Sequence, residues 1–244
     1  MDALVVEIAK RRRLSPVQRR KEILQKAIAL FAEEGFESST RELARRLGIT
    51  QPLLYRYFPS KDDLIRNVYE AVYLNRWENE WDRLLCDRSV AIEERLREFY
   101  TKYTDAIFSR EWMRIYFFSG LRGESINRWY IGLLEERILM RIAKEFRESA
   151  GINSENSVSP EELELIWALH SAIFYVGARE HIYGLKPHAS RELVILNTVR
   201  AFFVGMVDFY ERMARANLAP SRIKGGVREA TRPARRSRER PVAG

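Results

Sequence analysis

Residues 51–57 combine side chains that can hydrogen-bond phosphate oxygens with flat apolar side chains that can lie against bases. At helical spacing, Leu54 would turn inward and leave its neighbours exposed. The exposed set would be Gln51, Pro52, Leu53, Tyr55, Arg56 and Tyr57. Such a mixture of donors and flat apolar groups is typical of a helix that reads DNA.

Helix start and stop signals position this segment. Ser39 and Glu42 have the spacing of a capping box, in which each side chain bonds a free backbone amide. Gly48 would end that helix, because glycine adopts the left-handed conformation without a Cβ clash. Thr50 and Pro52 suit the N-cap and first turn of the next helix. Two short helices with so brief a joint indicate a helix-turn-helix, although an ordinary helical hairpin can have the same caps.

The aromatic run from Tyr55 to Phe58, followed by Ser60 and Lys61 at the start of a third helix, favours the helix-turn-helix. With it, residues 20–73 resemble the tetracycline-repressor (TetR) family of bacterial transcriptional regulators. The similar positions include Ala27, Leu30, Phe31, Gly35, Phe36, Thr40, Ala44, Gly48, Leu54, Tyr55, Tyr57, Phe58, Lys61 and Leu64. The resemblance covers about the first quarter of the chain.

The resemblance implies an all-α fold, and strand signals are indeed nearly absent from the sequence. It implies an N-terminal three-helix helix-turn-helix DNA-binding domain and a larger helical ligand-binding and dimerisation domain. We place the first at residues 15–61 and the second at 62–216. A basic flexible arm is expected over residues 1–14 and a basic disordered tail over 217–244.

The resemblance also implies roles for single residues. The positions that match backbone contacts in the family are Thr40, Thr50, Tyr57 and Lys61. A hydroxyl or ammonium group there can donate to phosphate without reading sequence. The positions that lie toward the groove and are expected to contact bases are Gln51, Leu53, Tyr55 and Arg56.

Positive charge is concentrated at the two ends of the chain. Residues 1–61 hold 13 basic and 7 acidic residues, and residues 222–244 hold 8 and 2, whereas the whole chain has a net charge of +8. The middle is therefore net negative. Double-stranded DNA bound near a terminus fits this distribution, and residues 10–13 could reach a minor groove beside the reading helix. Basic ends that only aid solubility, or that stay idle, remain the alternative.

Apolar residues recur at helical spacing along the rest of the chain. Ser15 and Pro16 begin a helix that ends at Gly35, and Ser60 begins a long helix that extends through Trp77 into the body. That long helix would link the two parts mechanically. Further helices are expected over residues 90–109, 112–117, 124–149, 159–183 and 190–216.

The central region is rich in large aromatic residues among a few polar groups, which is the composition of a small-molecule pocket. The candidate effector pocket comprises Tyr103, Trp112, Tyr116, Trp129, Trp167, His170 and Phe174. By resemblance, family members bind an inducer between these helices. A solid aromatic core has the same composition, and no ligand class is indicated.

The last helix has an apolar stripe wider than packing within one subunit requires. Its candidate dimer-interface residues are Phe202, Met206, Phe209 and Met213. The resemblance implies the same assembly, because the family dimerises through its last two long helices as a four-helix bundle. The alternative is that this stripe is simply interior.

Several classes of function are disfavoured. Cys86 is the only cysteine, which excludes an intramolecular disulfide, and His170 and His181 would stand about 16 Å apart on one helix, too far to share a metal ion. No glycine-rich phosphate loop or nucleophile elbow is present, so we expect neither an enzyme nor a cofactor. Without a signal sequence or roughly 20 consecutive apolar residues, we expect a cytoplasmic protein and no membrane partner.

Together these features predict a sequence-specific transcriptional regulator, a homodimeric repressor that a small-molecule effector releases from a palindromic operator on double-stranded DNA. The sign of regulation is taken from the family. A ligand-independent architectural protein that binds DNA is the first alternative, and an effector-binding enzyme or carrier is the second. A cavity in the body would separate the prediction from the first alternative.

Overall fold

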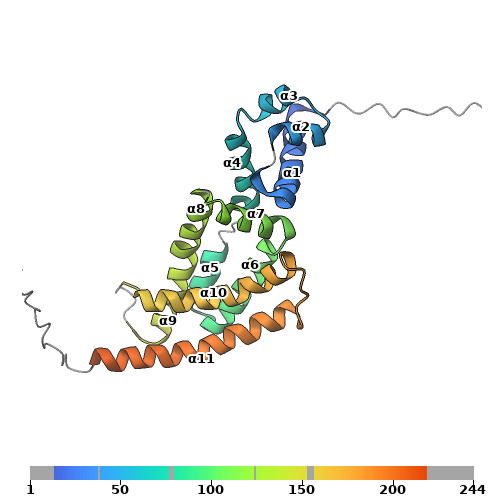
Figure 1. The fold of residues 1–244 in the computed structure, drawn as a ribbon. Coiled ribbons are helices and arrows are strands. Elements are labelled where there is room, and N and C mark those ends of the chain that lie inside the picture. Colours follow the sequence, from blue (N-terminus) through green and yellow to red (C-terminus); the bar gives the residue numbers. More distant parts are fainter. Residues whose placement is uncertain (1–13, 38, 77–79, 124, 153–156, 219–244) are drawn as a thin grey trace, which may run out of the picture.

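The computed structural model describes residues 14–37, 39–76, 80–123, 125–152 and 157–218, and within these ranges it is helical and has no strand (Figure 1). The α-helices are α1 (Pro16–Glu34), α2 (Thr40–Leu47), α3 (Gln51–Tyr57), α4 (Lys61–Val72), α5 (Glu80–Cys86), α6 (Ile92–Ile107), α7 (Arg110–Leu121), α8 (Ser125–Leu134), α9 (Met140–Ser149), α10 (Pro160–His181) and α11 (Arg191–Leu218). The all-α prediction is confirmed. The predicted arm, apart from Leu14, and the tail beyond Leu218 lie outside the described residues.

The first four helices form a small head at one end of an elongated molecule (Figure 1). Helix α1 has the predicted capping box: Ser15 accepts from the backbone N–H of Gln18, and the Gln18 side chain accepts from that of Ser15. Its apolar face buries Ile23 and Leu30 against α2 and α4. The apolar residues of the head pack on one another and continue into the core of the body, and this packing fixes the positions of the short helices.

The other helices form the body, in which α10 packs against α11, and α6 packs against both α5 and α11. The predicted helix over residues 124–149 is present as α8, a π-helical turn (η3, Glu135–Leu139) and α9. Two arginine–glutamate pairs lie inside the body. Arg147 bonds both oxygens of Glu162, and Arg95 bonds Glu145 at 2.9 Å.

The helix that begins at Ser60 is shorter than predicted. It ends at Val72, and a 3-10 turn (η2, Leu74–Arg76) follows, while α5 was not predicted. The Tyr73 ring lies 5.3 Å from that of Trp112 and 5.0 Å from that of Tyr130, between centroids. Burial of Tyr73 among these body rings draws the chain out of the helical path, and α5 then packs on α6.

Candidate functional site

Helices α2 and α3 meet at a tight turn at the tip of the head (Figure 1). Gly48 has φ 64° and ψ 34°, the left-handed conformation that ends α2, and its N–H donates to the carbonyl groups of Ala44 and Arg45. The Thr50 hydroxyl then accepts from the N–H of Leu53, which caps α3. Both predicted helix signals are confirmed, and together they fix the crossing of the two helices.

Only half of the predicted capping box on α2 is formed. The Ser39 hydroxyl accepts from the N–H of Glu42 at 3.1 Å, but the Glu42 carboxylate turns to Arg45 and Arg46, with Nε–oxygen distances of 2.8 and 2.9 Å. These hydrogen bonds lower the pKa of Glu42 to about 2. Guanidinium groups outcompete a backbone amide for a carboxylate because the bond is charge-assisted.

The sequence-predicted DNA-binding residues differ in exposure. Leu54 is buried and anchors α3 to the core, as predicted. The exposed members of the set are Thr50, Pro52, Tyr55 and Arg56. The half-buried members are Thr40, Gln51, Leu53, Tyr57 and Lys61, and Tyr57 packs against the core of the head. The set spans the start of α2, all of α3 and the start of α4.

A small hydrogen-bond network joins α2 to α3. Gln51 Nε2 donates to the Thr40 hydroxyl at 3.0 Å, and the hydroxyl groups of Thr40 and Tyr55 also lie 3.0 Å apart. The amide expected to read a base is thus linked to a hydroxyl expected to touch the DNA backbone. This arrangement holds both side chains before any DNA is present.

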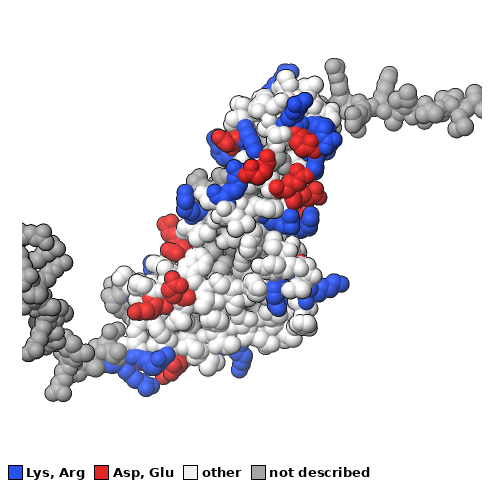
Figure 2. Space-filling view, in the orientation of Figure 1, with Lys and Arg blue, Asp and Glu red and all other residues white. Residues whose placement is uncertain are grey.

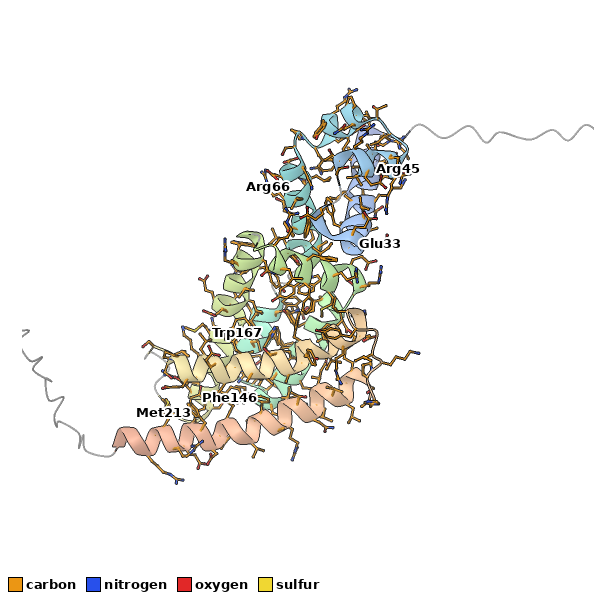
Figure 3. The ribbon with its side chains drawn as sticks, in the orientation of Figure 1. Glu33, Arg45, Arg66, Phe146, Trp167 and Met213 are labelled. Atoms are coloured by element: carbon orange, nitrogen blue, oxygen red, sulfur yellow. The ribbon has the colours of Figure 1, made fainter. Side chains whose placement is uncertain are left out.

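Cationic residues gather on the head, with acidic residues among them, whereas most of the body face in the same view is uncharged (Figure 2). Arg45 extends from the outer side of the head (Figure 3), and Arg41 is exposed in the first turn of α2 next to Thr40. The sequence interpretation missed Arg41. Its place at the start of the first helix of the motif, beside a predicted phosphate contact, could have indicated it.

Most of the predicted effector residues come together in the body. The Trp112 ring stacks on that of Tyr116 at 5.1 Å, and Phe174 lies 6.0 Å from Trp112 and 6.1 Å from His170. Tyr103 lies 5.5 Å from His170. We call Tyr100, Tyr103, Trp112, Tyr116, Tyr130, Trp167, His170 and Phe174 the aromatic cluster; helices α6, α7, α8 and α10 contribute to it.

Trp129 stays outside the aromatic cluster, because its side chain is 45% exposed. Trp167 borders the cluster: its ring lies edge-on to His170 at 5.9 Å, and its Nε1 donates to the Glu135 carboxylate at 3.1 Å (Figure 3). A cavity of about 610 Å³ lies elsewhere, between α6, α9 and the last turns of α11, where Phe146 and Val207 line it.

The last helix turns one face inward. Met206 is 2% exposed and packs inside the subunit together with Ile195, Val199 and Tyr210. Met206 therefore faces the core of its own subunit rather than the surface, because the helical repeat places it over the body core. The other three predicted interface residues, Phe202, Phe209 and Met213, are half-buried.

Helix α7 makes the contact between body and head. Arg114 donates from Nη2 to the Glu33 carbonyl oxygen at 3.0 Å and from Nε to that of Ala32, so it caps the C-terminal end of α1. Its guanidinium lies 5.2 Å from the Phe118 ring centroid. That ring would lie 3.2 Å from a Cβ atom on Gly35, whose φ is 72°. We call Arg114, Phe118 and the end of α1 the head–body contact.

Comparison with known proteins agrees with the geometry. Residues 23–68 match the model of bacterial regulatory proteins of the tetR family. Solved structures extend the similarity beyond the head. A TetR-family regulator from Mesorhizobium loti is 16% identical, with a TM-score of 0.55 over 79% of this chain and 98% of that one.

The regulator PfmR from Thermus thermophilus is 19% identical, with a TM-score of 0.54 over 75% of this chain and 97% of its own. The ketosteroid regulator KstR2 of Mycobacterium tuberculosis is 18% identical, with a TM-score of 0.55 over 77% and 94%. At this identity the likeness shows a shared fold. The match of the head identifies it as a helix-turn-helix DNA-binding domain of the TetR type, and the chain shares the fold of solved TetR-family regulators of transcription.

Proposed function

We propose that the protein is a homodimeric repressor that binds a palindromic operator and leaves it when a small molecule enters the aromatic cluster. One observation carries this proposal. A single helix, α7, contributes Trp112 and Tyr116 to the aromatic cluster and Arg114 and Phe118 to the head–body contact. A ligand that moves α7 therefore acts on the end of α1 directly.

The surface of the last two helices supports a dimer. The most apolar 18-residue stretch of α11, within residues 191–215, has a mean hydropathy of 1.5, yet only 22% of that stretch is buried in the subunit. Its exposed apolar residues include Leu193, Val204 and Val207. A helix this apolar could cross a membrane by length and composition alone, but here its inner face is core and α10 lies beside it. A second subunit covers the rest in our proposal, and the protein acts in the cytoplasm.

The dimer gives the heads a twofold arrangement. Helix-turn-helix dimers bind half-sites about one helical turn, roughly 34 Å, or a multiple apart. Gln51, Leu53, Tyr55 and Arg56 contact base edges in this proposal, while Thr40, Thr50, Tyr57 and Lys61 hold phosphates. The effector must favour one spacing of the heads over the other, because a ligand with equal affinity for both shifts nothing.

Mapping the protein across its own genome tests this function. Chromatin immunoprecipitation should recover a small set of sites that share a palindrome, upstream of genes whose transcripts rise when the regulator is deleted. Sites without a shared sequence would instead support the architectural alternative. If the transcripts fall on deletion, the protein is still a transcriptional regulator, but it is an activator rather than a repressor.

A further inference from the structure

Three buried polar atoms of the aromatic cluster have no hydrogen-bond partner among the described residues. They are the Tyr100 hydroxyl, Trp112 Nε1 and His170 Nδ1. Tyr100 and Trp112 are 0% exposed and His170 is 4% exposed. Because about 90% or more of buried polar groups in proteins are hydrogen-bonded, three orphan atoms in one cluster indicate a missing partner.

These three atoms belong to neighbouring rings. His170 lies 6.1 Å from Tyr100 and 6.1 Å from Phe174, and Phe174 lies 6.0 Å from Trp112. Other polar groups of the same cluster are paired. The hydroxyl groups of Tyr103 and Tyr130 lie 3.2 Å apart, and Trp167 donates to Glu135. Buried atoms without a hydrogen-bond partner among the described residues also occur elsewhere in the body, at Nε of Arg95 and Arg179 and at Nε2 of His181, but three of them meet in this one cluster around Phe174.

The charge of the surroundings limits what can fill this place. In the described residues, arginine guanidinium groups lie over the rings of Phe58, Phe118, Tyr175 and Phe108. None of these four rings belongs to the aromatic cluster. Burial lowers the pKa of His170 to about 4, so its imidazole is neutral at pH 7. An anion would enter unpaired, which is costly in an apolar interior.

A cation is disfavoured for a different reason. An indole N–H only donates, and the Trp112 Nε1–H needs an acceptor on the ligand. The carboxylate of Glu135, at the border of the cluster, already accepts from Trp167. The rings themselves offer flat apolar surfaces, which favour a flat apolar body.

We propose that the aromatic cluster binds an uncharged, flat aromatic compound whose carbonyl oxygen accepts a hydrogen bond from the Trp112 indole. This inference rests on the proposed function, in which the body receives an effector. It adds the chemical class of that effector.

The burial of the rings indicates the side from which a ligand enters the aromatic cluster. Tyr116, Phe117 and Phe174 are half-buried, and their ring centroids lie 5.2 to 6.3 Å apart, so they cover the deeper rings of Trp112 and His170. The rings are in contact with one another, so the ligand displaces them as it enters. The π-helical turn begins at Glu135, beside Trp167, and such turns occur frequently at functional sites.

Four naphthalene probes of matched size test the inference: 2-acetylnaphthalene, naphthalene, 2-naphthoate and 2-naphthylmethylamine. Calorimetry gives each affinity, and the indole N–H signals in a ¹⁵N-edited NMR spectrum report contact with Trp112, whose signal is assigned by its loss in Trp112→Phe. We expect 2-acetylnaphthalene to bind most tightly and to shift that signal. Tightest binding of 2-naphthoate or 2-naphthylmethylamine, or no shift with any probe, would overturn the inference.

Two variants sharpen the result. Trp112→Phe keeps a ring and removes the donor, so the affinity for 2-acetylnaphthalene should fall about fivefold, the effect of one lost hydrogen bond, while that for naphthalene stays unchanged. Trp129→Phe, at the exposed tryptophan outside the cluster, should change neither affinity. Equal loss for both probes in Trp112→Phe would contradict the assigned hydrogen bond.

An operator-binding assay on the same protein separates this inference from the proposed function. If 2-acetylnaphthalene binds at Trp112 without weakening operator binding, the ligand class stands and release by this class of effector fails. If no probe binds while the operator is still bound, the ligand class fails and the DNA-binding function stands.

Discussion

The head and the aromatic cluster treat their polar side chains in opposite ways. In the head, the groups expected to meet DNA already hold one another, as Gln51, Thr40 and Tyr55 do, and Glu42 holds two arginines at the surface. In the aromatic cluster of the body, by contrast, three buried polar atoms have no hydrogen-bond partner within the described part of the chain. A ligand-controlled DNA-binding protein requires a head whose DNA-contacting side chains are ordered before binding. It also requires a body with hydrogen-bonding groups that a ligand can satisfy.

The largest difference between the regions should appear in the unfolding free energy that is lost when an ion pair is broken. Glu162 is fully buried, and although burial alone would raise its pKa, the hydrogen bonds from Arg147 and the Ser159 amide lower it. Glu162→Ala leaves Arg147 buried and unpaired, and should cost about 3–5 kcal/mol of unfolding free energy. Glu34→Ala, which removes a surface pair with Arg46, should cost about 0–1 kcal/mol. Urea unfolding measures both.

The same pair gives a pH dependence. Because the folded-state pKa of Glu162 is depressed, its contribution is complete above its unfolded pKa, near 4.5, and is lost as pH falls below that value. Wild-type stability should therefore decline more steeply between pH 5 and 3 than that of the double variant Arg147→Met with Glu162→Leu. Parallel curves would show that the pair does not carry this linkage.

A charge on the outer face of α11 should break the proposed dimer. Val204 is 65% exposed in the subunit, so Val204→Glu leaves the subunit core intact but buries an unpaired carboxylate between subunits. Sedimentation should show a micromolar dimer for wild type and a folded monomer for the variant. Lys144→Glu, on the exposed side of α9, is the matched control and should stay dimeric. A dimeric Val204→Glu variant would place the interface elsewhere.

Breaking the head–body contact should affect the response to effector more than it affects the affinity for DNA. Arg114→Ala removes the bonds to the end of α1, far from α3, so operator affinity without effector should change less than about threefold, while release by effector should weaken about tenfold. Fluorescence anisotropy with labelled operator measures both. Arg110→Ala, whose guanidinium lies 4.0 Å from the carboxylate of Glu33, is the control because that pair is exposed. An unchanged response to effector in Arg114→Ala would show that α7 does not transmit the effector signal to the head.

The smallest effects separate positioning from reading within the head. Lys61→Ala should weaken all DNA about equally and lower the salt slope by about one per subunit. Gln51→Ala should instead reduce discrimination between operator and random DNA, and it also removes one of the two hydrogen bonds of the Thr40 hydroxyl. A Lys61→Ala variant with altered sequence preference and intact nonspecific affinity would reverse the two assignments.

The sequence predicts the head well because its signals are local. Ser15, Gly48 and Thr50 act through backbone groups a few residues away, so their effects follow from spacing alone. Glu42 departs from its predicted capping role because Arg45 and Arg46 compete for it. The early end of α4 depends on rings of Trp112 and Tyr130, which no local pattern near residue 72 reveals.

The body is less predictable because its faces depend on long-range packing. A uniformly apolar helix such as α11 does not reveal which side turns inward, so Met206 could not be told from a surface residue. The same holds for Trp129 and Trp112, which are alike in sequence context but exposed and buried in the fold. The orphan atoms of the aromatic cluster likewise become visible only once the rings are placed.

The central claim is that this protein recognises a palindrome as a dimer. The most direct test measures affinity at one salt concentration for the palindrome recovered from its genome, for a single half-site and for scrambled DNA of equal length. We predict two subunits per palindrome, binding at least about 10³-fold tighter than to scrambled DNA, with the half-site much weaker than the palindrome. Equal affinity for all three DNAs would contradict the account.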